Sequence, residues 1–210
     1  MKIDCHTHTN PFSACSTLAA DDLLVKAESS QLDGVVLTEH EVFWPEEQLR
    51  WLKKAHPELR IFNGVETDVG SLGHVVIIPA RPDDSILKIN TPDRLASYIA
   101  SSGNYAFVAH PFRFDREFEN RNPQFDLPGV EVASYNMHDR ESVLRSVEFA
   151  RERKVAPIAA SDAHSPEPIG KYYLEFEVSI ESQQDLIVAL HKRDFQPVAP
   201  VLAQGKDFQL

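Results

Sequence analysis

Cysteine is scarce in this sequence, with only Cys5 and Cys15 among 210 residues. Two cysteines cannot form the disulfide framework of a small secreted domain, so we expect both thiols to stay reduced. Long apolar runs are also lacking, because no stretch approaches the roughly 20 residues that a membrane-spanning helix needs. The first residues, MKIDCHTHT, contain no apolar segment typical of a secretory signal. We therefore expect a cytoplasmic protein that does not enter a membrane.

Basic side chains are outnumbered, since 21 lysines and arginines stand against 32 aspartates and glutamates, for a formal charge of −11. A surface of this sign does not favour binding a long nucleic acid through its phosphates. A small anionic substrate is compatible with it, because bound cations invert the local field. No repeat, low-complexity tract or Gly/Ser-rich linker divides the chain. We therefore expect a single domain over residues 1–210.

Short β-branched runs alternate along the chain with segments of helical periodicity. The expected strands cover residues 1–5, 35–38, 61–66, 73–78, 105–109, 129–134, 156–160 and 172–178. The expected helices cover residues 21–31, 45–55, 91–101, 139–153 and 181–193. Alternation of this kind predicts an α/β protein built of parallel βα units. The number of units predicts a barrel of about seven or eight strands.

The histidines are the main chemical signal, because several of the nine occur where an expected strand ends. In a parallel barrel such positions converge on one mouth. His6 and His8 have the spacing of two that places both imidazoles on one side of an extended chain. The other candidates at or near strand ends are His40, Glu66, His110, Asp162 and His164. Imidazoles with carboxylates suit Zn, Mn or Fe far better than Ca, so the pattern predicts a metal site.

His74 is a further ligand candidate in a different position, and several other polar residues nearby are expected outside the ligand set. His74 begins a strand and reaches the same mouth if that strand pairs antiparallel with the strand of Glu66. Glu39 and Glu41 flank His40 and alternate away from it, so support or surface roles are expected for them. His138 is expected in a loop or as support for a ligand. His56 and His191 stand at expected helix ends.

Seven segments carry a resemblance to a known family: DCHTHT, GVVLTEH, GVET, GHVVI, VAHPFR, GVEVASYN and SDAH, in this order between residues 4 and 164. Together they resemble the PHP (polymerase and histidinol phosphatase) family of metal-dependent phosphoesterases. The resemblance implies a distorted (β/α)₇ barrel. It also implies two or three divalent metal ions (Zn, Mn or Fe) at the carboxyl-terminal mouth of the strands.

The resemblance implies roles for the first ligands along the chain. His6 and His8 match the metal-binding pair of the first motif. His40 matches the histidine of a TDH-type motif, which reads TEH here. Glu66 matches the carboxylate that bridges two metals in the family.

The later motifs imply the remaining ligands. His74 and His110 match ligands of a second metal, while Asp162 and His164 match the pair of the last motif. The loop NPFSACST departs from the family, because many members with three metals carry a His or an Asp there. This loop offers Ser13 or Cys15 instead, and a ligand role for Cys15, like the third metal, stays open.

The implied reaction is hydrolysis of a small phosphate ester, either a phosphomonoester or a short nucleotide, by a metal-activated water. Glu66 would keep two cations close, and Asp162 or His164 would orient the water or protonate the leaving oxygen. Arg113 is the best candidate for a bidentate phosphate clamp. Lys171 is a weaker candidate at the rim of the mouth, as are two further arginines, Arg81 and Arg116.

Three other functions compete with this interpretation. A PHP-type nuclease or phosphodiesterase would use the same site on a different ester. Amidohydrolase-type and TatD-type hydrolases also start with an HxH pair, but the AHP and SDAH segments favour the PHP family. A non-catalytic metal-binding PHP module is disfavoured by the complete set of predicted ligands. The expected partner is a small phosphorylated molecule, and the sequence does not specify an oligomeric state.

Overall fold

The computed structural model describes residues 1–115, 117–124 and 126–204. Within these ranges, two five-stranded sheets are accompanied by six α-helices. The strands are β1 (Lys2–Thr7), β2 (Gly34–Leu37), β3 (Arg60–Asn63), β4 (Val65–Asp68), β5 (His74–Ile78), β6 (Tyr105–Val108), β7 (Gly129–Ala133), β8 (Ala156–Ala159), β9 (Tyr173–Phe176) and β10 (Phe195–Val198). The helices are α1 (Ala20–Ser29), α2 (Glu46–Ala55), α3 (Pro92–Ser102), α4 (Phe118–Arg121), α5 (Arg140–Arg153) and α6 (Gln183–Lys192). Single 3₁₀ turns are η1 (Gly70–Leu72), η2 (Ile86–Lys88) and η3 (Leu202–Gln204).

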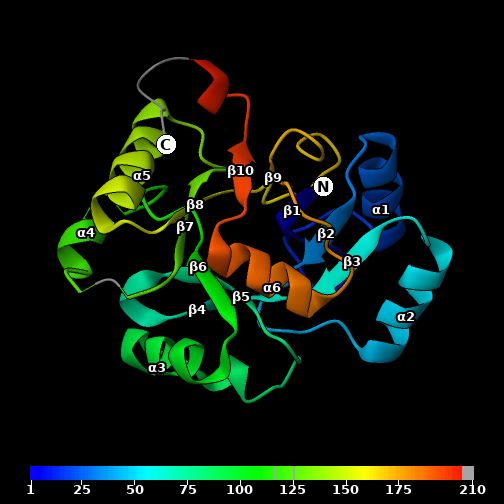
Figure 1. Cartoon of the computed structure of the whole chain (residues 1–210), viewed down its shortest axis with the longest axis horizontal. Coiled ribbons are helices and arrows are strands. Elements are labelled where there is room, and N and C mark those ends of the chain that lie inside the picture. The colour runs from blue at the N-terminus through cyan, green and yellow to red at the C-terminus, as the bar shows by residue number, and fades with distance from the viewer. Residues whose placement is uncertain (116, 125, 205–210) are drawn as a thin grey trace.

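The two sheets are mixed rather than purely parallel (Figure 1). The first has the order β10-β9-β1-β2-β3, and the second has the order β4-β5-β6-β7-β8. Parallel ladders join β1, β2 and β3 in one sheet and β6, β7 and β8 in the other. Antiparallel ladders join β5 to β4 and β6, and β9 to β1 and β10.

The predicted (β/α)₇ barrel is wrong, because no ladder among the described residues closes the two sheets on each other. Parallel neighbours need a crossover of a dozen or more residues, and the chain between β4 and β5 is too short for one. That segment therefore forms a hairpin in which Asp68 pairs with His74. Isolated bridges, Thr7 with Ala163 and His40 with Glu66, join the two halves of the structure. The α/β character of the prediction is correct.

The break between the sheets falls at Gly64, inside the segment 61–66 that the sequence predicts as one strand. A Cβ at Gly64 would lie 3.0 Å from the carbonyl oxygen of Ile77 and 3.0 Å from Cγ1 of Val36. Glycine thus permits a close approach of chains from both sheets. The result is that β3 ends one sheet and β4 begins the other.

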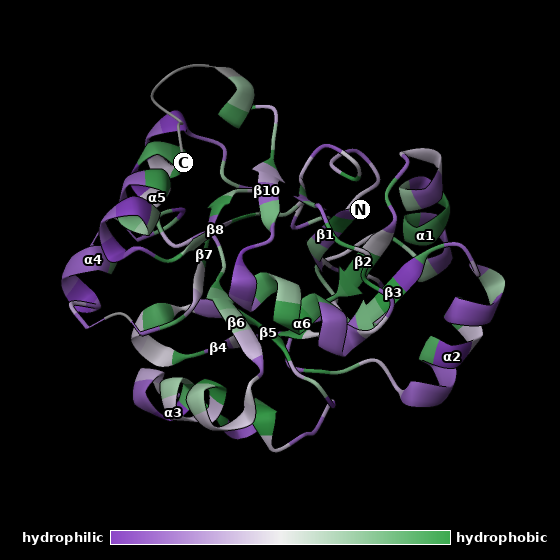
Figure 2. Cartoon of the chain, in the orientation of Figure 1, coloured by the Kyte–Doolittle hydropathy of each residue, from purple (hydrophilic) through white to green (hydrophobic). Residues whose placement is uncertain are grey.

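Alternation along the strands divides the apolar residues between the two faces of each sheet. Val36 and Val76 point inward, into a core that the inner faces share with α6. Val35 points outward and packs under α1 and α2, while Val75 packs under α3 and α5. Figure 2 shows the same pattern, with apolar strands at the centre and polar helix faces outside. Helix α6 thereby covers one end of the inner core.

Helix ends follow ordinary capping chemistry. Asp139 accepts a hydrogen bond from the amide of Ser142 at the start of α5, and Ser182 forms a capping box with Asp185 at the start of α6. Gly103 ends α3 in a left-handed conformation with φ of 66°. No helix within the described ranges is long and apolar enough to cross a membrane.

Candidate metal centre

The first two histidines meet at the carboxyl end of β1. Because their side chains lie on the same side of an extended segment, the Nε2 atoms of His6 and His8 are only 3.0 Å apart. Both side chains are fully buried. The spacing of two thus brings the imidazoles together, as the sequence predicts.

Glu66 lies at the centre of the cluster and is 1% exposed. Its Oε2 atom lies 3.5 Å from Nε2 of His6, 3.2 Å from Nε2 of His8 and 3.0 Å from Nδ1 of His40. Its Oε1 atom lies 3.0 Å from Nδ1 of His74 and 3.4 Å from Nε2 of His110. The two oxygens of one carboxylate therefore face two different groups of imidazoles.

Asp162 approaches the same cluster from the end of β8. Its Oδ1 atom lies 3.5 Å from Nε2 of His6 and 3.3 Å from Nε2 of His8. Its Oδ2 atom lies 3.5 Å from Nη1 of Arg113 and accepts a hydrogen bond of 2.8 Å from Asn136. One carboxylate oxygen thus faces the histidines and the other faces a cation.

The backbone is left-handed at two predicted ligands, His110 with φ of 31° and Asp162 with φ of 50°. Non-glycine residues rarely adopt such values, and they persist where surrounding contacts hold them. Here the amide of His110 donates to Oε2 of Glu131, and the amide of Asp162 donates to the carbonyl of His6. These bonds fix two ligand candidates toward the same point.

Buried carboxylates outside the predicted ligand set orient the imidazoles. Nδ1 of His6 lies 3.1 Å from Oε1 of Glu131, which leaves Nε2 as the nitrogen with a free lone pair. Glu39 accepts from the amide of Thr9, from the indole of Trp44 and from the hydroxyl of Ser13. The role of Glu131 was not apparent from sequence, although a charged residue inside the apolar strand GVEVA is itself a signal.

Asp4 stabilises the backbone on both sides of the cluster. Its Oδ1 atom accepts hydrogen bonds from the amides of Ser161 and His6. Burial raises the pKa of Asp4 to about 7, although these hydrogen bonds oppose the shift. Asp4 thus ties the end of β1 to the chain that follows β8.

The protonation of the imidazoles depends on position. Burial lowers the pKa of His40 to about 4 against the attraction of Glu66, and burial also lowers the pKa of His164. Both are therefore neutral at pH 7, the form that binds a metal. Burial opposes protonation of His6 as well, but carboxylates, chiefly Asp162, outweigh it and raise its pKa well above the usual range. A divalent cation would compete with that proton.

The last motif lies beside the loop that follows the first histidine pair. His164 is 3.6 Å from Oδ1 of Asp162 through Nδ1 and 3.1 Å from Sγ of Cys15 through Nε2. Cys15 is exposed. Burial and the nearby carboxylates raise the pKa of the Cys15 thiol.

The donor set fits divalent metal ions. Three groups have their potential ligand atoms within 4.8 Å of one another: His8, His40 and His164; His6, His8 and Glu66; and His40, Glu66 and His74. Both carboxylate oxygens of Glu66 are buried and have no hydrogen-bond donor among the described residues. Buried acceptors without donors are costly, and a cation placed between them and the imidazole lone pairs would satisfy both. The identity and the number of the ions are not fixed by this geometry.

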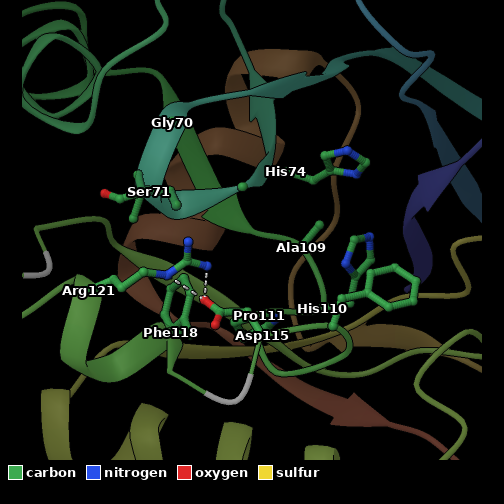
Figure 3. A pocket seen from close by; sticks show the side chains of 12 residues that line it. Gly70, Ser71, His74, Ala109, His110, Pro111, Asp115, Phe118 and Arg121 are labelled. Atoms are coloured by element: carbon green, nitrogen blue, oxygen red, sulfur yellow. Dashed lines mark hydrogen bonds and ion pairs between the residues drawn. The ribbon is translucent and has the colours of Figure 1, made fainter.

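A small cavity of about 210 Å³ opens beside His74 and His110 (Figure 3). The turn Gly70–Gly73 and the apolar side chain of Phe118 form part of its wall. Arg121 also lines it but is paired with Asp115. A small recess therefore lies directly next to two candidate ligands, His74 and His110.

Some predicted residues lie away from the cluster. Lys171 is half-exposed and pairs with Glu167 at 3.5 Å, and no described contact joins it to the histidines. Arg81 lines a separate cavity with Trp44, and His138 is exposed in a loop after β7. Arg116 lies outside the described residues. The role predicted for Lys171 stays a prediction.

Comparison with known proteins adds a family match and several similar folds. Residues 141–195 match a family model described as PHP-associated. No curated protein sequence matches the chain. A two-domain protein from Bacteroides vulgatus, which contains a predicted PHP-like metal-dependent phosphoesterase, has a TM-score of 0.62 at 16% identity, and the match covers 95% of this chain but only 64% of that protein.

Two further solved structures have a similar fold. An amidohydrolase from Chromobacterium violaceum, with bound sulfate and no metal, has a TM-score of 0.62 at 16% identity, over 95% of this chain and 99% of that one. A protein from Bifidobacterium adolescentis, named as a candidate metal-dependent phosphoesterase, has a TM-score of 0.55 at 14% identity, over 90% of this chain and 96% of that one. At these identities the likeness concerns the fold.

Proposed function

We propose that this chain is a metal-dependent hydrolase of small phosphate esters of the PHP type, which its motifs, the PHP-associated match over residues 141–195 and its fold support. The observation that carries the proposal is the position of Glu66. One of its oxygens faces His6, His8 and His40, and the other faces His74 and His110. A carboxylate placed between two groups of imidazoles is suited to hold two cations close together.

Divalent ions of the Zn, Mn or Fe class would supply Lewis acidity and an acidified water at this site. His6, His8, His40, Glu66, His74, His110, Asp162 and His164 are the proposed ligands. Two or three ions are expected on this set. The buried members of the set, His6, His8, Glu66, His110 and Asp162, keep bulk water from the inner side of the site, which strengthens electrostatic interactions there.

Arg113 is proposed to bind the phosphate. Its Nη1 atom lies 3.5 Å from Asp162, and its buried Nε atom has no hydrogen-bond acceptor among the described residues. A guanidinium group with a free donor beside the cluster is suited to non-bridging phosphate oxygens. The side chain is also held in place, because it stacks on the ring of Phe114 at 4.5 Å.

Proton transfer is assigned to Asp162 or His164. Asp162 has one oxygen toward the histidines and one toward Arg113, so it can orient a water between cluster and phosphate. His164 is neutral at pH 7 because burial lowers its pKa, so its Nε2 can accept a proton when it does not bind a metal. The leaving group of the substrate is placed in the cavity beside His74 and His110, whose volume of about 210 Å³ favours a small group.

A second candidate function is amide hydrolysis, which the fold shared with the Chromobacterium violaceum amidohydrolase favours. Both reactions would use the same cluster, but a tetrahedral phosphate needs the additional cation that Arg113 provides. A nuclease acting on long chains is disfavoured by the formal charge of −11. The proposed partner is therefore a small phosphorylated molecule.

One assay distinguishes these functions. The protein is stripped with a chelator, reloaded separately with Zn, Mn or Fe, and offered phosphomonoesters, phosphodiesters, oligonucleotides and N-acyl amides in parallel. We expect metal-dependent turnover that is fastest on a small phosphomonoester or short nucleotide. Amide cleavage without phosphate release would establish the second candidate, and no turnover with any metal would indicate a non-catalytic module.

A further inference from the structure

Asn136 lies in the turn that follows β7, next to the chain that leaves β8. The amide of Met137 donates to the carbonyl oxygen of Ser134 and closes the turn, and the amide of Tyr135 donates to the carbonyl oxygen of Ser161. The side chain of Asn136 is half-buried. The backbone of this turn is therefore fixed beside the segment that carries the last two predicted ligands.

The side-chain amide of Asn136 makes two hydrogen bonds to one residue. Its Nδ2 atom lies 2.8 Å from the carbonyl oxygen of Asp162 and 2.8 Å from Oδ2 of the same residue. A carbonyl and a carboxylate can only accept, so the amide must turn its nitrogen toward them, and both hydrogens of that nitrogen are used. Asn136 therefore holds Asp162 by its backbone and by its side chain.

The backbone of Asp162 depends on such contacts, because its φ of 50° is one that non-glycine residues rarely adopt. Its amide donates to the carbonyl oxygen of His6 at 2.8 Å. Its carbonyl oxygen accepts from Nδ1 of His164 at 2.9 Å as well as from Asn136. The bond from His164 leaves Nε2 of that imidazole with the free lone pair. Asn136 thus acts on a carbonyl that also orients the neighbouring ligand.

The two oxygens of the Asp162 carboxylate have different partners. Oδ1 faces the cluster, 3.3 Å from Nε2 of His8, whereas Oδ2 accepts the hydrogen bond from Asn136. Two other groups lie farther from Oδ2, Arg113 at 3.5 Å and His110 at 3.8 Å. Asn136 is therefore the nearest donor to Oδ2 among the described residues.

We propose that Asn136 is a positioning residue that keeps Asp162 in place as a metal ligand bound through Oδ1. This inference rests on the proposed metal-dependent function and assigns to it a residue outside the ligand set. By donating to Oδ2, Asn136 leaves Oδ1 as the oxygen that is open toward a cation beside His6 and His8. By donating to the carbonyl oxygen, it holds the backbone conformation that directs the carboxylate at the cluster. Groups that orient a ligand in this way contribute about 10- to 100-fold to metal affinity.

The test measures metal binding rather than turnover. The full chain is stripped with a chelator and titrated with Zn²⁺ in competition with a chelating indicator, and the visible spectrum of bound Co²⁺ is recorded at saturation. We expect Asn136→Ala to weaken zinc binding by about 10- to 100-fold and to change the Co²⁺ spectrum, because one ligand moves. Asn136→Gln keeps both N–H donors and should recover part of the lost affinity.

Tyr135→Phe is the matched control, because it removes a hydrogen bond of the same turn that does not involve Asp162. The hydroxyl of Tyr135 donates to Oε2 of Glu167 at 2.7 Å, and Glu167 is exposed. This variant should keep the zinc affinity and the Co²⁺ spectrum of the unmodified protein. An equal loss of affinity in Tyr135→Phe and Asn136→Ala would show that Asn136 only stabilises the turn, and would overturn the inference.

The remaining outcomes separate this inference from the proposed function. Unchanged zinc affinity and an unchanged Co²⁺ spectrum in Asn136→Ala would refute the role of Asn136 and leave the metal-dependent function standing. If the unmodified protein binds neither Zn²⁺ nor Co²⁺, both fail. Should far-ultraviolet circular dichroism show that Asn136→Ala does not fold, Asn136→Leu replaces it, since leucine has a similar shape and no donor. The same loss of zinc affinity is expected there, and full affinity would refute the inference.

Discussion

The hydroxyl of Ser13 donates a hydrogen bond of 2.5 Å to the carboxylate of Glu39. A hydroxyl has one proton, so toward His8, whose Nδ1 lies 3.2 Å away, Ser13 can only accept. Nδ1 of His8 therefore carries the proton, and Nε2 presents its lone pair to Glu66 and Asp162. The side chain of Glu39 thus selects the tautomer of His8 through Ser13, without bonding to His8 itself.

This relationship predicts the effect of Glu39→Gln. The amide of glutamine can donate to Ser13, which allows the hydroxyl to turn its proton toward His8 and favours the tautomer with hydrogen on Nε2. Metal affinity should fall by about 10- to 100-fold, the usual range for loss of a group that orients a ligand. Competition with a chelating indicator measures the dissociation constant.

Glu41→Gln is the matched control for that experiment. Glu41 lies two residues away but is exposed and bonds to Thr67 and to the amide of Asp68. Its variant should keep the metal affinity of the unmodified protein. Equal affinity in all three proteins would show that Glu39 does not select the tautomer.

The central position of Glu66 predicts a loss of metal in Glu66→Gln. The substitution keeps the shape of the side chain and removes one negative charge between two groups of imidazoles, so neighbouring cations repel each other more. Metal content after reconstitution should fall by at least one ion per chain, with unchanged far-ultraviolet circular dichroism. Glu177→Gln, at an exposed position, serves as control. Unchanged occupancy and turnover in the Glu66 variant would refute the bridging role.

Periodicity predicted most of the secondary structure because local patterns determine it. The expected segments 35–38 and 139–153 lie within one residue of β2 and α5 at both ends. The arrangement of the strands in two open sheets was not predictable in this way, since strand direction depends on connections and on contacts between distant segments. The hairpin at Asp68 and His74, and the break at Gly64, decide the arrangement, and neither has a periodic signature.

The candidate ligands were found because polar residues are rare in buried strands and their spacing follows strand geometry. The residues that orient these ligands through hydrogen bonds were harder to recognise from sequence. Glu39 was expected in a support or surface role, and it is fully buried, which excludes the surface role. Glu131 contacts His6 over 125 positions of sequence, and Glu39 acts on His8 through Ser13, which lies 26 positions before it. Such partners depend on the folded chain and not on local pattern.

The buried hydroxyl of Tyr105 leads us to predict a stabilising substitution. Its hydroxyl is buried, and among the described residues it has no hydrogen-bond partner. Because an unsatisfied buried polar group costs about 1–3 kcal/mol, Tyr105→Phe should raise the free energy of unfolding by about 1 kcal/mol. Tyr98→Phe is the contrasting variant, since the Tyr98 hydroxyl accepts a bond from Asn104, and it should lower that free energy. Urea titration followed by fluorescence measures both, and a loss of stability in Tyr105→Phe would contradict the argument.

The position of Arg113 beside Asp162 leads to a prediction about substrate binding. Arg113→Ala removes the guanidinium beside Asp162, and loss of a charged hydrogen bond of about 1.5–3 kcal/mol should lower kcat/KM for a phosphomonoester by about 10- to 150-fold, with a raised KM. Arg113→Lys should recover only part of this loss, because lysine lacks the planar fork. Arg50→Ala, on the exposed face of α2, is the control and should leave kinetics unchanged. If phosphomonoesters are not cleaved and long oligonucleotides are, with a steep dependence on salt, the site serves a nuclease, and the clamp assigned to Arg113 must be abandoned.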